Sequence, residues 1–341
     1  MQSIGIIGGG AWGTALGLVA LRAGRVPMLW AREPEVVAAI NSRHENTLFL
    51  PDAALDPRLG ATGELAEAAA RDLLLLAVPA QHLRAVAGAL ASHLKPGTPV
   101  VVCAKGIEER TGALLSEALA EALPHAPVAL LSGPTFATEV AAGHPTAITL
   151  AASDAALGQR LIQCLGSRAF RPYYTDDVAG AQIGGAIKNV IAIACGIVVG
   201  RKLGDNARAA LITRGLAEMA RLALAKGGRA ETLMGLSGLG DLTLTCTSLQ
   251  SRNHSLGVAL GEGKRLADIL AARRSVAEGV TSAAAAAALA QRLGIDMPIV
   301  AAVDAILHRG AAIDAAIEAL LSRPFRSEAR AASQQDLVRD L

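Results

Sequence analysis

The sequence predicts an α/β fold, in which a doubly wound parallel sheet is followed by an all-helical C-terminal domain. Short apolar runs of strand length alternate with helical patterns in the first half, and a glycine-rich turn follows the first run. Strand signals stop after about residue 176. A chain of 341 residues has room for two domains. We therefore expect an α/β domain over 1–175, an all-helical domain over 176–323 and a polar tail over 324–341.

The predicted strands are apolar along their whole length. They cover 4–7, 26–30, 73–78, 100–103 and 128–131, with helical patterns at 11–23 and 34–42. A strand that is apolar throughout is typical of a parallel sheet covered by helices on both faces. In the second half, helical patterns cover 181–200, 206–226, 281–293 and 298–321.

Composition excludes several classes of protein. The chain has 32 basic and 30 acidic residues, and this balance argues against a nucleic-acid partner, which requires a basic excess. Its four cysteines form no C-x-x-C pair, so we expect no metal site and reduced, buried thiols in the cytoplasm.

Residues 3–21 carry no charge and could be mistaken for a signal peptide or a membrane helix. A signal peptide needs a basic segment before the apolar one, and Met1-Gln2-Ser3 has none. Glycines also cluster within the stretch. We therefore expect a strand, a glycine turn and a helix here, with neither secretion nor a membrane span.

The segment from Gly8 to Gly13 (GGGAWG) fits the pattern G-x-G-x-x-G between a strand and a helix. Gly8 permits a tight turn, Gly10 lets the backbone approach a pyrophosphate, and Gly13 lets the helix pack on the strand. The helix N-terminus then presents N–H groups to the phosphates. This setting predicts a Rossmann domain that binds a dinucleotide; the alternative is a glycine-rich turn in an unrelated α/β protein.

The end of the second strand, Trp30-Ala31-Arg32-Glu33, bears on the choice of dinucleotide. An acid about 20 residues after the glycine turn is typical of NAD proteins. Arg32 favours contact with a 2′-phosphate, hence NADP(H) or use of both cofactors. The alternative is a solvated Arg32, with Glu33 binding the ribose of NAD(H).

Lys188 is the candidate catalytic residue. At helical spacing its face carries Gly184, Gly185, Ala192 and Cys195, all small, which would leave room for a ligand and little water. Desolvation lowers the pKa of a lysine toward the range useful for proton transfer. The alternative is a lysine that extends to the surface.

Further polar residues follow the strands or cluster later in the chain. Lys105 follows the strand at 100–103, and Ser132-Gly133-Pro134-Thr135 follows the last one and is expected to start a helix. Ser251-Arg252-Asn253, at an expected helix start, would suit a phosphate, and Asp241 could orient a lysine or a substrate hydroxyl. The alternative is a capping serine with a solvated arginine. Glu278 lies in an expected helix-breaking turn and means little by itself.

Together these segments resemble the bacterial-type NAD(P)-dependent glycerol-3-phosphate dehydrogenases over nearly the whole chain. The similar segments are GGGAWGTAL from Gly8, SGPTFA from Ser132 with Glu139, GGAIKNVIAI from Gly184, NARAALITRGLAEM from Asn206, GLGDLTLTCT from Gly238, Ser251-Arg252-Asn253 and Glu278-Gly279.

The resemblance implies a Rossmann domain followed by a helical domain, a homodimer, and oxidation of glycerol 3-phosphate to dihydroxyacetone phosphate with NAD(H) or NADP(H). It implies Lys188 as proton acceptor. The implied substrate positions are Lys105, Gly133, Thr135, Lys188, Asp241, Ser251, Arg252 and Asn253. The implied cofactor positions are Ala11, Trp12, Arg32, Lys105, Ala137, Arg252, Val276 and Glu278, beside the three motif glycines. Ala104, Ala11 and Ala31 depart from the residues usual in the family, Thr, Ser and a polar residue respectively.

Two other functions fit parts of this pattern. One is another dehydrogenase with the same two-domain plan, acting on 6-phosphogluconate or ketopantoate; the Arg252-Asn253 cluster and SGPTFA argue against it. The other is a dinucleotide sensor without catalysis, which would not need a desolvated Lys188. The resemblance further implies that glycerol 3-phosphate serves phospholipid synthesis.

Overall fold

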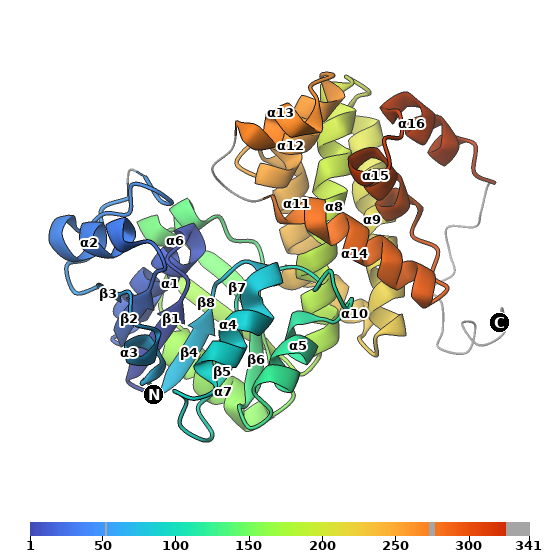
Figure 1. Ribbon diagram of the computed structural model, residues 1–341. Coiled ribbons are helices and arrows are strands. Elements are labelled where there is room, and N and C mark those ends of the chain that lie inside the picture. Colours follow the sequence, from blue (N-terminus) through green and yellow to red (C-terminus); the bar gives the residue numbers. More distant parts are fainter. Residues whose placement is uncertain (52, 273–276, 325–341) are drawn as a thin grey trace.

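The computed structural model describes residues 1–51, 53–272 and 277–324. Figure 1 shows a sheet with its helices beside a second body that is built of helices. The strands are β1 (Ser3–Ile7), β2 (Val26–Trp30), β3 (Gly60–Thr62), β4 (Leu73–Leu76), β5 (Val100–Val102), β6 (Val128–Ser132), β7 (Thr146–Ala151) and β8 (Phe170–Thr175). They form one sheet in the order β3-β2-β1-β4-β5-β6-β7-β8.

The five predicted strands are present, and β1 pairs in parallel with both β2 and β4, as in a Rossmann sheet. The predicted strands all pair in parallel, but the sheet continues beyond them, and there β7 runs antiparallel to β6. The connection between them contains only the short helix α6 (Ala137–Ala142), and the chain turns at Gly143, where φ is +80°. Antiparallel neighbours need no crossover helix, so a short connection suffices.

Alternate side chains of each strand enter different cores, which shows that the sheet is covered on both faces. Leu73 and Leu75 pack with α1 (Ala11–Arg22), α6 and α7 (Ala155–Leu165), whereas Leu74 and Leu76 pack with α3 (Leu65–Ala69), α4 (Leu83–Leu90) and α5 (Leu115–Ala122). The remaining helical elements of this part are α2 (Pro34–Arg43) and the 3₁₀ turn Ala80–His82. The doubly wound arrangement expected from the apolar strands is confirmed.

No strand follows β8 in the described residues, and helices make up the second body. They are α8 (Val178–Gly200), α9 (Asp205–Ala225), α10 (Ala230–Leu233), a π-helical turn (Leu236–Gly240), α11 (Asp241–Thr247), α12 (Arg252–Gly261), α13 (Leu266–Ala271), α14 (Glu278–Arg292), α15 (Pro298–His308) and α16 (Ile313–Leu321). The single helix expected over 298–321 is two helices, because the chain turns at Gly310, where φ is +68°. Apart from Pro324, the expected tail 324–341 lies outside the described residues.

Helix α8 is the centre of the helical body. It is long and apolar enough to cross a membrane, but 89% of its most apolar window is buried inside the protein, as in a core helix. Glycines bring α12 very close to it. A Cβ at Gly196 would lie 2.1 Å from the His254 carbonyl oxygen, and a Cβ at Gly257 would lie 2.1 Å from that of Ile193. This packing fixes the position of α8 relative to α12.

Candidate active site

The candidate site lies where α8 and α11 of the helical body meet the carboxyl ends of β5 and β6. Lys105 follows β5, and Gly133 follows β6. Open α/β sheets bind ligands outside the carboxyl ends of their strands. Lys188 comes from α8 and Asp241 is the first residue of α11. Residues far apart in the sequence therefore meet at one place.

Lys188 is buried, with 7% of its surface exposed, so the alternative of a lysine that extends to the surface does not hold. Its Nζ donates hydrogen bonds to Asp241 Oδ1 at 2.8 Å and to Thr245 Oγ1 at 2.8 Å. Burial lowers the pKa of Lys188 to about 8, while the Asp241 carboxylate opposes that change. The amine can therefore exchange a proton near neutral pH.

Asp241 joins the two lysines. Its Oδ1 accepts from Lys188, and its Oδ2 accepts from Lys105 Nζ at 2.7 Å. Lys105 also donates to the Gly133 carbonyl oxygen at 2.9 Å. Asp241 is 1% exposed, so its charge has little access to water. Two amines around one carboxylate leave the cluster positive, which suits an anionic ligand. Of the two partners expected for Asp241, a lysine or a substrate hydroxyl, the structure shows contacts with both lysines.

The small residues beside Lys188 have a different use from the one expected. A Cβ at Gly184 would lie 2.4 Å from the Ser237 carbonyl oxygen, and a Cβ at Gly185 would lie 2.5 Å from Ser132 Oγ and 3.4 Å from Lys105 Cγ. The interpretation that this face leaves room for a ligand was therefore wrong at both glycines. They admit neighbouring protein instead, and so bring Lys105 close to α8.

The residues around Ser251 combine a structural role with exposed charge. Ser251 caps α12 by accepting from the His254 N–H at 3.1 Å, which is the helix start that the sequence predicts. Arg252 follows at the surface. The buried Asn253 donates to Asn189 Oδ1 at 2.9 Å and accepts from the Gly279 N–H at 2.9 Å. Asn253 thus joins α8, α12 and α14 beside Lys188.

Glu278 is the first residue of α14, and Ala277 precedes the helix as its N-cap. The expectation that Glu278 lies in a helix-breaking turn was therefore wrong. Burial raises the pKa of the Glu278 carboxyl to about 7, while the Ala80 N–H and the charge of Arg252 oppose that rise. Val276 lies outside the described residues.

The glycine turn after β1 is shaped for close approach of a ligand. Gly8 has φ +128°, and a Cβ on it would lie 2.9 Å from the Ala77 carbonyl. A Cβ at Gly13 would lie 1.9 Å from the Gly8 carbonyl oxygen, so only glycine lets α1 pack there. A Cβ at Gly10 would meet nothing within 4 Å. Gly10 is the N-cap of α1, and Ala11 and Trp12 begin that helix, so its first N–H groups border open space. This geometry fits a dinucleotide pyrophosphate.

The residues at the end of β2 form a pair. Arg32 donates to Glu33 Oε1 through both Nε, at 3.2 Å, and Nη2, at 3.0 Å, and its side chain is 79% exposed. Arg32 and Glu33, the two candidates for binding the adenine ribose of a dinucleotide, are therefore paired with each other.

The segment Ser132-Gly133-Pro134-Thr135 does not start a helix, because α6 begins at Ala137 with Phe136 as its N-cap. Thr135 Oγ1 donates to the Gly133 carbonyl oxygen at 3.1 Å, which stabilises a loop in front of α6. This is the carbonyl that Lys105 contacts. The structure therefore brings Gly133 and Lys105 into contact. The hydroxyl of Thr135 is bonded within its own loop.

Sequence reasoning gave no role to Thr245 or Asn189. Thr245 lies four residues after Asp241, one helical turn away on the same face, and this spacing was the available signal. Asn189 follows Lys188, but its partner Asn253 is 64 residues away, so nothing local reveals the contact.

Comparison with known proteins places the chain in a family. Residues 3–158 match the family described as NAD-dependent glycerol-3-phosphate dehydrogenase N-terminus, and residues 177–318 match the corresponding C-terminus. The chain belongs to the NAD-dependent glycerol-3-phosphate dehydrogenase family. The first matched region covers β1 to β7 and the second covers nearly all of the helical part, so the resemblance seen in the sequence is confirmed.

Relatives support this over the full length. The glycerol-3-phosphate dehydrogenase [NAD(P)+] of Parvibaculum lavamentivorans is 59% identical over 327 residues, covering 96% of this chain and 98% of the relative. The glycerol-3-phosphate dehydrogenase structure from Coxiella burnetii is 40% identical, with a TM-score of 0.91 over 94% of this chain and 99% of that one. A ketopantoate reductase from Ralstonia eutropha, 17% identical, has a TM-score of 0.60 over 90% of this chain and 97% of its own, and so shares the fold alone.

Proposed function

We propose that this protein catalyses reversible hydride transfer between sn-glycerol 3-phosphate and NAD(P)+, giving dihydroxyacetone phosphate and NAD(P)H. The observation that carries this proposal is the buried amine of Lys188, held by Asp241 and Thr245 at the mouth of a dinucleotide fold. Membership of the dehydrogenase family supports it. The alternative of a sensor without catalysis leaves this buried lysine–aspartate cluster without a purpose.

When bound, the nicotinamide supplies a hydride acceptor for the hydrogen on C2 of the alcohol. Lys188 in its neutral form takes the proton of the C2 hydroxyl, so that an electron pair is free to form the carbonyl. In the reverse direction the ammonium form returns the proton to the carbonyl oxygen. Asp241 keeps the amine in place in both directions, because its carboxylate accepts from either form.

We propose further that Lys105 and Arg252 neutralise the phosphate of the substrate. Arginine and lysine are the side chains that bind phosphate best, and a helix start adds N–H donors. The proposed substrate positions are Lys105, Gly133, Thr135, Lys188, Asp241, Ser251, Arg252 and Asn253. Thr135 would have to turn from the Gly133 carbonyl to reach the substrate.

We propose Gly8, Gly10, Ala11, Trp12, Gly13, Arg32, Lys105, Ala137, Arg252 and Glu278 as cofactor positions; Val276, which belongs with them by resemblance, lies outside the described residues. The pair of Arg32 and Glu33 supports use of both cofactors. A 2′-phosphate would attract Arg32 away from Glu33, whereas the ribose of NADH would bind the carboxylate. Titration of the protein with NADH and with NADPH tests this, since a strong preference for NADH would overturn the proposed role of Arg32.

We propose domain limits of 1–175 and 176–323, a homodimer, no membrane span and a place in the cytoplasm, where glycerol 3-phosphate would serve phospholipid synthesis. The matched regions at 3–158 and 177–318 support the division, and four free, buried cysteines support a reducing compartment.

The proposed reaction is tested directly by supplying dihydroxyacetone phosphate with NADPH or NADH and following nicotinamide absorbance. We expect oxidation of the cofactor by the native protein and almost none by Lys188→Ala. If the native protein binds cofactor but oxidises it no faster than that variant, it is a dinucleotide sensor and not this enzyme.

A further inference from the structure

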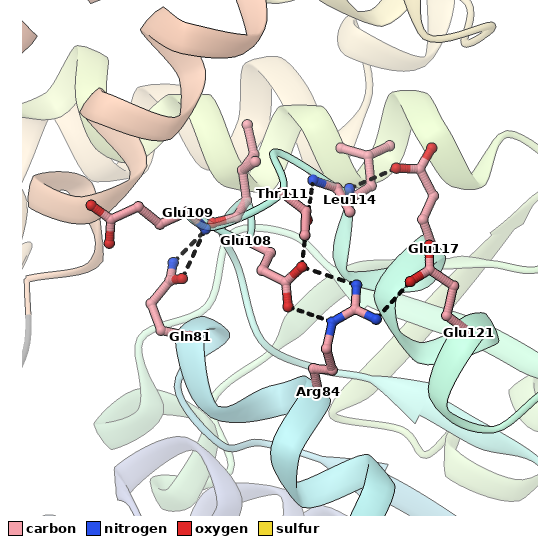
Figure 2. Close-up of polar contacts among 10 residues, drawn as sticks. Gln81, Arg84, Glu108, Glu109, Thr111, Leu114, Glu117 and Glu121 are labelled. Carbon is pink, nitrogen blue, oxygen red and sulfur yellow. Dashed lines mark hydrogen bonds and ion pairs between the residues drawn. The ribbon is translucent and has the colours of Figure 1, made fainter.

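We infer that Glu108 and Arg84 are positioning residues, which hold Lys105 against Asp241 by anchoring the loop that follows Lys105. This inference rests on the proposed function, in which Lys105 binds the substrate. Neither residue touches the candidate site. Four side chains make the contacts, Gln81, Arg84, Glu108 and Thr111, and we call them the loop anchor (Figure 2).

The loop runs from Gly106 to Leu114, between Lys105 and α5. At Gly106 φ is +153°, and a Cβ there would lie 2.8 Å from Ala80 Cβ, so the chain passes tightly against the start of the Ala80–His82 turn. Ile107 then pairs antiparallel with Leu114, and the Glu108 N–H donates to the Ala113 carbonyl oxygen at 3.0 Å. The loop is therefore a unit that is closed by pairing between its two ends.

Arg84 of α4 holds this unit from one side. Its guanidinium donates through Nε to Glu108 Oε1 at 2.7 Å and through Nη2 to Glu108 Oε2 at 2.9 Å, which is the two-point geometry of a strong arginine–carboxylate pair. Glu108 is 7% exposed, unusual for a glutamate in a loop. The bond from Arg84 lowers the pKa of the Glu108 carboxyl, which therefore stays ionised. Figure 2 shows the guanidinium between Glu108 and Glu121.

Two further contacts fix the orientation of the loop. Gln81 donates through Nε2 to the Ile107 carbonyl oxygen at 2.9 Å and accepts at Oε1 from the Glu109 N–H at 2.9 Å. The Thr111 hydroxyl contacts the Glu108 carboxylate. The Thr111 carbonyl oxygen accepts from Arg292 of α14 at 2.8 Å, so Thr111 also ties the loop to the helical body.

These contacts act on Lys105 because only Gly106 and Ile107 separate it from Glu108. Strand β5 holds the chain before Lys105, and the loop anchor holds it afterwards. The lysine side chain has four rotatable bonds and loses much conformational freedom when its amine is fixed beside Asp241 and the Gly133 carbonyl. A backbone fixed on both sides keeps the amine within reach of both partners. A shift of about 1 Å in such a group can cost a large factor in rate.

The test compares two glutamates that pair with the same guanidinium. Glu108→Gln weakens the buried pair, whereas Glu121→Gln weakens the exposed one at Arg84 Nη1, 2.6 Å away, without touching the loop. We expect Glu108→Gln to raise KM for dihydroxyacetone phosphate on the order of 10-fold, with the Kd of NADH changed less than twofold. Glu121→Gln should leave both values unchanged. Gln81→Ala, a milder change, should raise KM in the same direction if Glu108→Gln folds poorly.

A double-mutant cycle with Lys105→Met distinguishes an effect of Glu108 on the position of Lys105 from an effect on stability alone. If the loop anchor acts through Lys105, adding Glu108→Gln to Lys105→Met should raise KM no further, because coupled residues are not additive. An equal rise in both backgrounds, or a lower Tm with KM unchanged in both Glu108→Gln and Gln81→Ala, would overturn the inference. Absence of any turnover by the native protein would instead refute the proposed function, so the two failures are distinguishable.

Discussion

Lys188 Nζ lies 2.8 Å from Asp241 Oδ1, and the other oxygen of the same carboxylate lies 2.7 Å from Lys105 Nζ. One buried acid thus sets the position of two amines that come from different bodies of the protein. Burial lowers the pKa of Lys188, and the Asp241 charge raises it, so the final value near 8 is a balance between the two.

This balance predicts opposite pH dependences for the two directions of the reaction. Oxidation of glycerol 3-phosphate needs the neutral amine, so kcat/KM should rise with pH up to about 8 and then level. Reduction of dihydroxyacetone phosphate needs the ammonium form, so its kcat/KM should fall as pH rises above about 8. Steady-state rates from pH 6 to about 9.5, at fixed ionic strength, check both curves. Parallel curves in the two directions would contradict this assignment.

Replacing Asp241 by Asn should change both the rate and the pH profile. Asn keeps the shape of the side chain but removes the charge that raises the pKa of Lys188, so that pKa should fall below its native value of about 8. The rise in oxidation rate should then occur at lower pH. We expect kcat to drop by about 100-fold, because one carboxylate oxygen is replaced by an NH2 donor and one of the two amines loses its acceptor. The Kd of NADH serves as the control and should change little. A pH profile that does not move would exclude Asp241 as the charge that sets this pKa.

Gly185 and Ser132 offer a paired test of packing beside the site. Gly185→Ala places a Cβ 2.5 Å from Ser132 Oγ, and such overpacking should destabilise the protein by about 1–3 kcal/mol and raise KM. The Ser132 hydroxyl has no hydrogen-bond partner in the described part of the chain, so Ser132→Ala alone should cost little. The double variant should recover much of the lost stability in urea unfolding. If it is no more stable than Gly185→Ala, the contact is not the cause.

Glu218 predicts a loss of stability as pH rises. This buried carboxylate of α9 accepts from the Ile299 and Val300 N–H groups at the start of α15, at 2.7 and 3.1 Å, yet burial still raises its pKa to about 7. The folded state then holds a proton that the unfolded chain releases near the ordinary value of 4.5, so stability falls as pH rises from about 4.5 to about 7.

Glu218→Gln should remove that dependence, because Gln does not titrate. The free energy of unfolding of the native protein minus that of the variant should decrease by about 1–3 kcal/mol between those pH values. Urea unfolding at several pH values measures it. A constant difference would show that the pKa of Glu218 is the same in the folded and unfolded states, and that burial does not raise it.

The sequence was enough to predict what depends on local pattern. The apolar runs predicted β1, β2, β4, β5 and β6, because strands buried on both faces have no polar alternation. The strands it missed are short or carry polar residues, such as β3 with three residues and β8 with alternating exposure. The orientation of β7 depends on a short connection whose turn at Gly143 has no distinctive pattern.

Sequence could predict a site residue where the segment around that residue has a distinctive pattern of its own. Lys188 could be chosen because a lone lysine lies among apolar residues, and the structure buries it. Its contact with Asp241 joins residues 53 apart, and that between Arg84 and Glu108 joins residues 24 apart, so only the fold brings them together. In the sequence, Glu108 looks like an ordinary surface glutamate. Nothing near it indicates that Arg84 of α4 will pair with it.

The central claim is that the Lys188 amine is kept dry enough to lose its proton near neutral pH. Carbon-13 NMR of protein labelled at lysine Cε, with cofactor bound, measures this as a titration of each lysine between pH 6 and about 11. We expect one lysine signal with a pKa of about 8 that is absent from Lys188→Met. If the signal lost in that variant titrates at the ordinary lysine value near 10.5, the proposed base does not exist.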